Sequence, residues 1–209
     1  GRKGPVWIDV PIDIQNKQVS EEVDTVFFDP WYNKLNINNM HMNEVFELLN
    51  NSKRPLILAG NGIRNANAME QLNLLCNLCD VPVVTSRGGI DIIDSDSPYF
   101  IGRPGSYGDR ASHFAIQESD LLLIMGSRLS VSTIGYYPER FGKNAIKVMI
   151  DIDEKELAKE EVPIQYKIKA DIFEFIKVLC EKYSKRNIFH REWIQHCREN
   201  KEKYPIVLD

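Results

Sequence analysis

The sequence predicts an α/β fold: a six-stranded parallel Rossmann-like sheet with helices on both faces, flanked by linker segments at both ends. Over residues 41–183, short apolar segments alternate with segments that repeat apolar residues at helical spacing. The apolar segments are continuous, which is typical of parallel strands buried on both faces. With 209 residues, of which 43% are hydrophobic, the chain is long enough for one such domain plus extensions.

The predicted strands are short, apolar and bounded by Gly, Pro or Asp. In chain order they cover residues 55–59, 81–85, 99–101, 121–125, 146–152 and 165–168. The predicted helices between them cover residues 43–51, 66–79, 109–118, 153–160 and 171–183. In the last helix Ile172, Ile176 and Tyr183 belong to a single apolar stripe, as expected of a helix that packs with one face against a sheet.

Both ends of the chain differ from this alternating region. Residues 1–15 predict one strand that ends in a turn. Residues 16–40 have little periodicity but several aromatic residues, which favours a linker held on a domain surface. Residues 184–209 are polar and charged, and a predicted helix at about 190–203 has only a narrow apolar stripe, which favours an exit linker. The chain does not begin with Met, which fits a piece of a longer protein.

The composition argues against several classes of protein. A formal net charge of −4 argues against a general nucleic-acid surface. The sequence has no run of about 18 apolar residues, so we expect no membrane helix. Its first residues do not form a signal peptide, and together with the cysteine usage this favours a reducing, cytoplasmic location.

Cysteine and histidine give only weak signals for a metal or redox site. Cys76 and Cys79 form one C-x-x-C pair, but they fall on the apolar positions of a predicted helix. A buried helix face is therefore the favoured interpretation, with a redox or metal role as the alternative. The four histidines show no metal-ligand spacing, and we expect His113 to be a surface or partly packed residue rather than a catalytic base.

A ligand is expected at the carboxyl ends of the strands, where open parallel sheets bind their ligands. Gly, Ser, Thr, Arg or Asp follow every predicted strand, in segments 60–64, 86–89, 102–110, 126–135, 151–153 and 170–171. Glycine lets a ligand approach the backbone, arginine binds phosphate, and carboxylates accept hydrogen bonds from ribose hydroxyls. Together these loops predict a nucleotide or dinucleotide site, whereas any one of them is equally consistent with an ordinary strand-to-helix turn.

The usual NAD-binding motif is incomplete in this sequence. Gly60-x-Gly62 is not followed by the third glycine of G-x-G-x-x-G, because Asn65 stands at that position. Arg87 follows the second predicted strand, where an acidic residue would bind the ribose of NAD. The sequence therefore does not predict an ordinary nicotinamide-dependent dehydrogenase.

Several motifs, taken in order, resemble the acetolactate synthase type of thiamine-diphosphate-dependent enzymes. They include "GRKGPVWIDVPIDIQ", "KRPLILAGNGIR", "GGIDIIDSDSPYFIGRPGSYGDRASHFAIQESDLLLIMGSRL" and "VMIDIDEKELAK". The resemblance implies that residues 1–15 are the tail of an N-terminal pyrimidine-binding domain and residues 16–40 a linker. It also implies that residues 41–183 are a central nucleotide-binding-like domain and residues 184–209 a linker to a C-terminal diphosphate-binding domain.

In that family the central domain holds FAD, ADP or another nucleotide, or nothing. Carried over by position, the residues expected at the nucleotide are Gly60, Gly62, Ser86, Gly105, Ser106, Arg128, Asp151, Asp153 and Asp171. The loop "GRPGSYGDR" at 102–110 would lie under the flavin or its pyrophosphate. Residues 103–105 replace a usual G-M-H-G, and residues 129–132 replace an acid pair and an arginine. In both places the sequence resembles the acetolactate synthase-like proteins of surface-polysaccharide pathways.

The resemblance also implies what the chain does not do alone. The glutamate that activates thiamine would lie upstream, and the G-D-G…N motif for magnesium and the diphosphate downstream. Thiamine diphosphate and magnesium would then bind only the full-length parent, a homo-oligomeric carboligase or decarboxylase of a 2-keto acid such as pyruvate. The chain itself would contact a nucleotide and its neighbouring domains, with no catalytic or metal-binding residue. The alternatives are a structural spacer that binds no nucleotide, or an independent NAD-binding enzyme.

Overall fold

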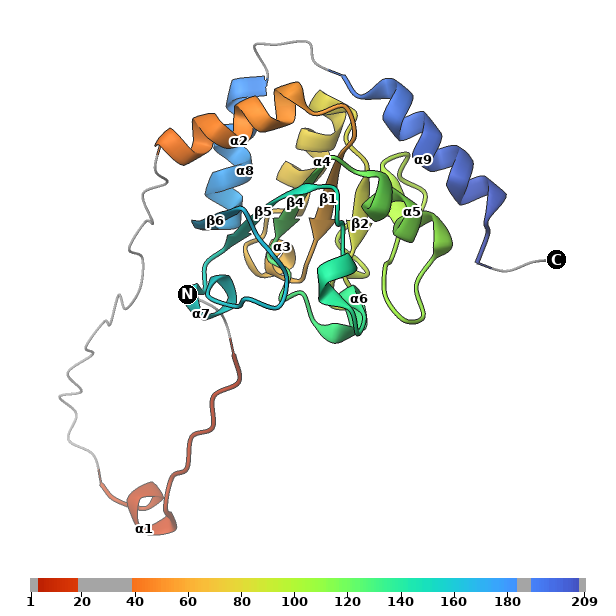
Figure 1. Cartoon of the computed structure of the whole chain (residues 1–209). Coiled ribbons are helices and arrows are strands. Elements are labelled where there is room, and N and C mark those ends of the chain that lie inside the picture. The colour runs from red at the N-terminus through yellow and green to blue at the C-terminus, as the bar shows by residue number, and fades with distance from the viewer. Residues whose placement is uncertain (1–3, 19–38, 184–188, 207–209) are drawn as a thin grey trace.

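The computed structural model describes residues 4–18, 39–183 and 189–206. Its centre is a six-stranded sheet in which every pairing is parallel (Figure 1). The strands are β1 (Pro55–Ala59), β2 (Val83–Thr85), β3 (Phe100–Gly102), β4 (Leu121–Met125), β5 (Ile146–Asp151) and β6 (Tyr166–Lys169), in the order β3-β2-β1-β4-β5-β6. The predicted fold class is confirmed, and each predicted strand is found with small shifts of its boundaries.

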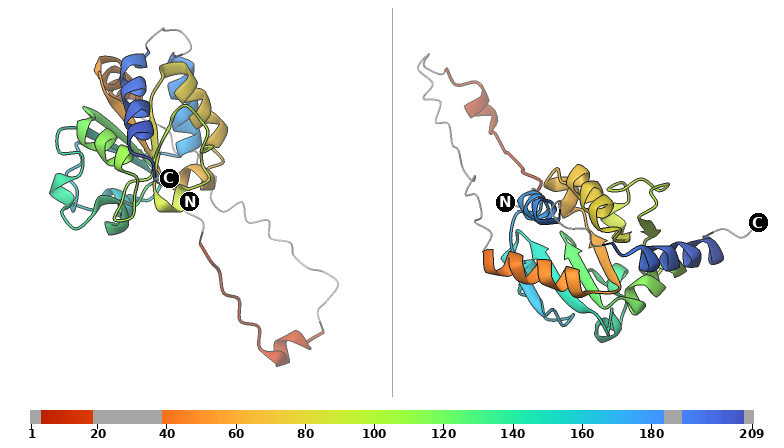
Figure 2. Two further views of the ribbon diagram at one scale, coloured as in Figure 1. Left: turned by 90° about the vertical axis from the view of Figure 1, so that its right-hand side faces the viewer. Right: turned by 90° about the horizontal axis from the view of Figure 1, so that it is seen from above.

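Helices cover both faces of the sheet, as the two rotated views show (Figure 2). One face carries α2 (Asn39–Asn51), α4 (Met69–Cys79) and α8 (Ile172–Tyr183), and the other carries α5 (Arg110–Glu118) and α9 (Arg191–Lys203). The short helices are α1 (Ile12–Gln15), α3 (Gly62–Asn65), α6 (Val131–Ile134), α7 (Glu154–Leu157), η1 (Arg87–Gly89) and η2 (Pro138–Arg140). The helix expected at 153–160 is thus present only as the short helix α7.

The two central strands are buried because each of their faces packs under a different layer of helices. β1 and β4 pair along their whole length, and every residue in both is buried. Within β1, Ile57 and Ala59 belong to the core under α2, α4 and α8, whereas Leu56 and Leu58 belong to the core under α5 and α9. Successive side chains of a strand point to opposite faces, so a strand covered on both sides has a continuous apolar sequence.

β1 and β4 are neighbours in the sheet although β2 and β3 lie between them in the sequence. From β1 the chain continues to β2 on one side, and from β4 it continues to β5 on the other side. The loops after β1 and β4 therefore diverge at the carboxyl edge, and such a divergence is where open α/β sheets bind their ligands. The sequence predicted a ligand at this edge.

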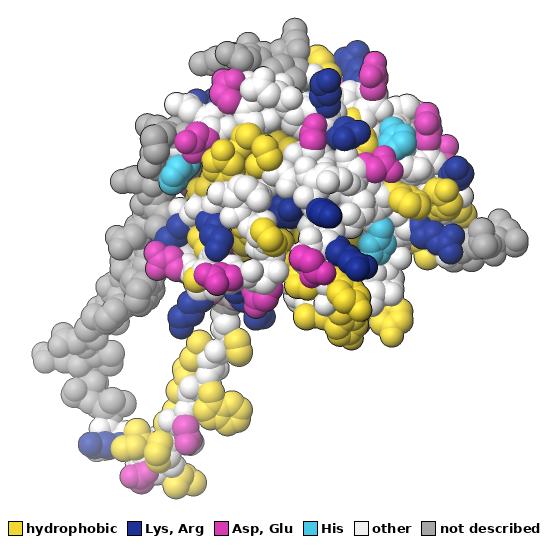
Figure 3. Space-filling view, viewed as in Figure 1, with side chains coloured by type: hydrophobic (Ala, Val, Ile, Leu, Met, Phe, Trp, Pro, Cys, Tyr) yellow, Lys and Arg dark blue, Asp and Glu magenta, His cyan; other side chains and the backbone are white. Residues whose placement is uncertain are grey.

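The N-terminal segment does not form the predicted strand. Residues 4–11 have no regular structure, and α1 follows them. Every described residue of this segment is exposed, including Val6 (83%) and Trp7 (91%), and Figure 3 shows a row of apolar side chains along it. A strand needs a neighbour for its backbone hydrogen bonds, and no described residue pairs with this segment. The prediction of a strand is therefore wrong for this chain, although the apolar residues that suggested it are present.

The helix predicted near residues 190–203 is confirmed as α9, and it packs more closely than a simple linker would. The apolar stripe of Trp193, Ile194 and Cys197 is buried, and α9 lies against α5 and β3. Trp193 Nε1 donates a 2.8 Å hydrogen bond to the carbonyl of Pro55 at the start of β1. Lys201 Nζ donates a 2.9 Å hydrogen bond to the carbonyl of Phe100 in β3. α9 thus covers the β3 edge of the sheet.

Candidate functional site

Two cavities lie at the carboxyl edge of the sheet. The larger has a volume of about 760 Å³ and is bordered by the loops after β2, β4 and β5. The smaller has a volume of about 300 Å³ and is bordered by the loops after β1, β4, β5 and β6. Asn61, Gly126 and Arg128 line both cavities, so the two are adjacent and meet at the switch point between β1 and β4.

The glycines after β1 and β4 allow the two loops to touch. A Cβ on Gly60 would come within 2.5 Å of Ser127 Cα, and a Cβ on Gly62 would lie 2.6 Å from Gly126 Cα. The Gly60 amide donates to the Met125 carbonyl at 2.8 Å, and the Gly62 amide donates to the Gly126 carbonyl at 3.0 Å. These two amides are already used in backbone hydrogen bonds, so the glycines set how closely the loops approach at the base of the crevice.

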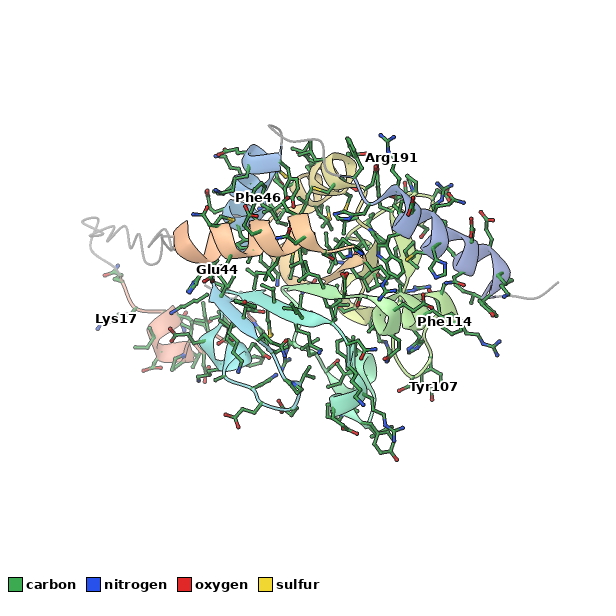
Figure 4. All side chains as sticks on the ribbon, turned by 45° about the horizontal axis from the view of Figure 1, so that its top comes forward. Lys17, Glu44, Phe46, Tyr107, Phe114 and Arg191 are labelled. Atoms are coloured by element: carbon green, nitrogen blue, oxygen red, sulfur yellow. The ribbon has the colours of Figure 1, made fainter. Side chains whose placement is uncertain are left out.

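The loop at 102–110 is held by hydrogen bonds between Arg103 and Asp109. The Asp109 carboxylate accepts a 2.8 Å hydrogen bond from the Arg103 amide, and the Asp109 amide donates to the Arg103 carbonyl at 2.8 Å. Gly105 has φ +131°, and a Cβ there would collide with the Ser132 carbonyl in the loop after β4. The loop therefore packs beside the wall of the larger cavity, and its tip residue Tyr107 projects into solvent (Figure 4).

Carboxylates follow β5 and β6. Asp151 is buried and accepts a 2.9 Å hydrogen bond from the Asp153 amide. Asp153 in turn caps α7 by accepting a 2.9 Å hydrogen bond from the Lys155 amide. Asp171 accepts a 3.3 Å hydrogen bond from the Glu174 amide at the start of α8. Of these three residues, Asp151 and Asp171 line the smaller cavity, whereas Asp153 does not.

Arg128 is held by a buried glutamate. Its Nε donates a 2.9 Å hydrogen bond to Glu156 Oε1, and the other carboxylate oxygen, Oε2, pairs with Lys159 Nζ. Both ion pairs line the larger cavity, which also has Ser86 and Thr133 among its lining residues. The remaining wall is largely apolar, with Val131, Ile134, Met149, Val162 and Ile164. The larger cavity therefore combines several charged side chains, which also include Arg87 and Glu161, with an apolar surface.

A comparison with protein families identifies the fold as a known type of domain. The family model described as "Thiamine pyrophosphate enzyme, central domain" matches residues 42–179. The chain belongs to this family. The predicted resemblance to thiamine-dependent enzymes of the acetolactate synthase type is thereby confirmed, and the matched range corresponds to the sheet and its covering helices from α2 to α8.

The curated relatives of this central domain include acetolactate synthase large subunits. The chain is 29% identical over 213 residues to the "Acetolactate synthase large subunit" of Lactococcus lactis, covering 100% of this chain and 36% of the relative. It is 31% identical over 224 residues to the "Probable acetolactate synthase large subunit" of Methanococcus aeolicus, covering 100% and 37%. Against "Acetolactate synthase 2, chloroplastic" of Nicotiana tabacum the identity is 31%, covering 99% and 32%. The chain thus spans about a third of the length of these relatives.

The central domain brings together some of the residues predicted at a nucleotide. Ser86 and Arg128 line the larger cavity, and Gly62, Arg128, Asp151 and Asp171 line the smaller one. Gly60, Gly105, Ser106 and Asp153 line neither cavity. Sequence reasoning missed Glu156 and Lys159. Their opposite charges three residues apart, just after a strand, were a signal that could have found them.

Other reactive side chains of the central domain lie away from the cavities. Cys76, Cys79 and Cys180 are free thiols buried between α4 and α8, which confirms the buried-helix interpretation. Burial raises the pKa of Cys180 to about 11, and burial also raises the pKa of Cys76 and Cys79, so these thiols stay protonated at neutral pH. His113 is a surface residue, as predicted, and its Nε2 lies 3.0 Å from the Gly105 carbonyl.

Within residues 4–18, 39–183 and 189–206, no group of three or more His, Cys, Asp or Glu side chains is placed to hold a metal ion. In the same ranges, no helix has the length and apolar character that crossing a bilayer requires.

Proposed function

We propose that the chain is the central part of a larger thiamine-diphosphate-dependent enzyme and binds a nucleotide, FAD or an ADP-like molecule, in the paired cavities. The observation that carries this proposal is the position of Arg128, which lines both cavities at the switch point of the sheet. A guanidinium at that position can bind phosphate oxygens. A nucleotide with its pyrophosphate beside Arg128 would extend into both cavities.

The residues around Arg128 suit the parts of a nucleotide. Ser86 and Thr133 offer hydroxyls for phosphate oxygens, and Asp151 and Asp171 offer carboxylates that accept hydrogen bonds from ribose hydroxyls. The apolar wall of the larger cavity offers a surface for a ring system. Its volume of about 760 Å³ also falls within the range of roughly 300–1,000 Å³ that is typical of small-molecule sites.

The reaction of the parent enzyme is proposed from the family. Because the relatives are named acetolactate synthases, we propose that the whole protein acts on a 2-keto acid such as pyruvate, as a carboligase or decarboxylase. Thiamine diphosphate, bound with magnesium in the neighbouring domains, supplies the carbon nucleophile for that reaction. The present chain positions those domains and holds the nucleotide without catalysing the reaction. We further propose that the parent is a cytoplasmic homo-oligomer.

A structural spacer without a nucleotide is the second candidate. One observation favours it: Gly60, Gly62 and Gly105 are all required by the close packing of backbone loops, with no ligand needed to explain them. An independent NAD-binding enzyme has less support, since the family model covers most of the chain and no described histidine lines either cavity.

Absorbance and thermal unfolding of the purified chain test the nucleotide proposal. After mixing with FAD and desalting, we expect the chain to retain a flavin absorbance band. A ligand present at 100 times its dissociation constant should also stabilise the fold by about 2.7 kcal/mol, which raises the melting temperature. Arg128→Ala should weaken both effects, because a phosphate would lose its charge-assisted hydrogen bonds. A chain that stays colourless and gains no stability from FAD or ADP is a spacer.

A further inference from the structure

A buried carboxylate stands between the two cations that border the larger cavity. The Glu156 side chain is only 6% exposed, whereas those of Arg128 and Lys159 are 63% and 38% exposed. Each oxygen of the carboxylate pairs with one cation, Oε1 with Arg128 Nε and Oε2 with Lys159 Nζ. Arginine and lysine bind a phosphate group through the same kind of charge-assisted hydrogen bonds. Glu156 therefore already makes, with Arg128 and Lys159, the kind of charge-assisted hydrogen bonds that an anionic group of a ligand could make.

We infer that Glu156 is a specificity-determining residue, whose carboxylate takes a phosphate position in the larger cavity and limits how much phosphate charge a ligand can place there. The inference rests on the proposed nucleotide site and specifies the ligand charge that the site accepts. A ligand with few phosphate groups fits beside the occupied position. A ligand with more phosphate groups must compete with Glu156 for Arg128 and Lys159.

The charge of the cavity wall agrees with this role. Arg87, Arg128 and Lys159 are cationic and Glu156 and Glu161 are anionic, so one positive charge remains in excess. Neutralising Glu156 would leave an excess of two, with both cations free to meet a phosphate. Because Glu156 is buried, its charge is screened less by solvent than the charge of an exposed side chain.

The fold holds Glu156 in place by local means. Asp153 caps α7 through the Lys155 amide at 2.9 Å, and α7 buries Glu156 and Leu157 against the domain. Burying a carboxylate is unfavourable unless cations pair with it, and Arg128 and Lys159 supply that pairing. Glutamine has nearly the same shape and can still accept the hydrogen bond from Arg128 Nε. Glu156→Gln is therefore the variant that removes the charge with the smallest change in packing.

Titration calorimetry of three proteins tests the inference: the chain itself, Glu156→Gln, and Glu161→Gln. The third is the matched control, because Glu161 lines the same cavity but is exposed. The probes are adenosine, AMP, ADP and inorganic pyrophosphate at low salt. We expect Glu156→Gln to bind ADP and pyrophosphate about tenfold more tightly than the unchanged chain, with a smaller gain for AMP and none for adenosine. Glu161→Gln should change these affinities less than about threefold.

The outcomes separate this inference from the proposed function. If the unchanged chain binds ADP or FAD and Glu156→Gln leaves the ADP and pyrophosphate affinities as they were, the inference is overturned and the nucleotide site stands. If Glu156→Gln gains pyrophosphate affinity while no protein binds a nucleotide, the inference stands and the proposed function fails. Equal gains in ADP and pyrophosphate affinity for both variants would also overturn the inference, since removing any negative charge from the cavity wall would then have the same effect. Circular dichroism and the unfolding midpoint confirm that both variants are folded.

Discussion

The glycines at the switch point matter mainly because they have no side chain, which lets two loops pack closely. Gly60, Gly62 and Gly126 lie where the loops after β1 and β4 meet, and a side chain on Gly60 or Gly62 would run into the facing backbone. Backbone atoms cannot rotate away as a flexible side chain does, so the two loops would have to separate. Arg128 lies two residues after Gly126 in the loop after β4. The packing of the glycines therefore also positions the backbone that carries the Arg128 side chain of the candidate site.

Gly60→Ala should destabilise the domain by about 1–3 kcal/mol, the usual cost of forcing an extra carbon into a close-packed position. The measurement is the midpoint of urea unfolding. Gly88→Ala is the matched control, since a Cβ there would meet only Asn61 Cβ at 3.6 Å, an ordinary contact. If both variants unfold at the same urea concentration, the close packing of the two loops does not contribute to stability.

The sequence singled out Gly60 and Gly105 as important, but it could not show that they are needed for loop packing. Gly60 and Gly105 were predicted as ligand contacts from the family resemblance, and the structure places both against the loop after β4. The contact of Gly60 depends on β1 lying beside β4, which no local pattern reveals. Glu156 was missed for a related reason: its importance comes from Arg128, which lies 28 residues away in the sequence.

At the scale of elements, the six strands and most of the helices lie where the sequence predicts them. The continuous apolar segments at 55–59 and 121–125 became the central strands, because both of their faces are covered. Residues 4–11 are also apolar, but with no described neighbour they form no strand. α9 is the opposite case. Its apolar stripe is narrow in the sequence, yet the helix packs against the domain, because Trp193 makes a hydrogen bond with the start of β1.

Trp193→Phe should destabilise the domain by about 1–3 kcal/mol, because the Pro55 carbonyl loses the indole donor while the aromatic packing is largely kept. Urea unfolding measures the loss, and hydrogen exchange shows whether it is confined to α9. Gln195→Ala, at an exposed position of the same helix, should change the midpoint little. An unchanged midpoint for Trp193→Phe would mean that the hydrogen bond does not hold the helix.

At the scale of the whole molecule, the sheet order β3-β2-β1-β4-β5-β6 determines where a ligand can bind. The carboxyl ends of all six strands lie at one edge of the sheet, and the two cavities meet there at the switch point between β1 and β4. This edge was predictable from the alternation of strands and helices, whereas the division into two cavities that share Arg128 was not. The chain covers about a third of the length of its acetolactate synthase relatives.

We expect the isolated chain to release no carbon dioxide from pyruvate when supplied with thiamine diphosphate and magnesium. The reason is that the family match is to a central domain, and the chain spans about a third of the length of its relatives. Coupled detection of carbon dioxide measures the reaction, with a full-length acetolactate synthase assayed in parallel. Turnover that scales with the concentration of the chain would overturn this expectation.

The attachment of α9 has a mechanical consequence. A pull on the chain near Ile206 reaches the sheet first through α9, whose anchors at Lys201 and Trp193 lie one after the other along the helix. Contacts arranged in this way are loaded in turn and peel apart, whereas the paired residues of β1 and β4 lie deep in the sheet and share any load. Under tension we expect α9 to detach before the strands of the sheet separate.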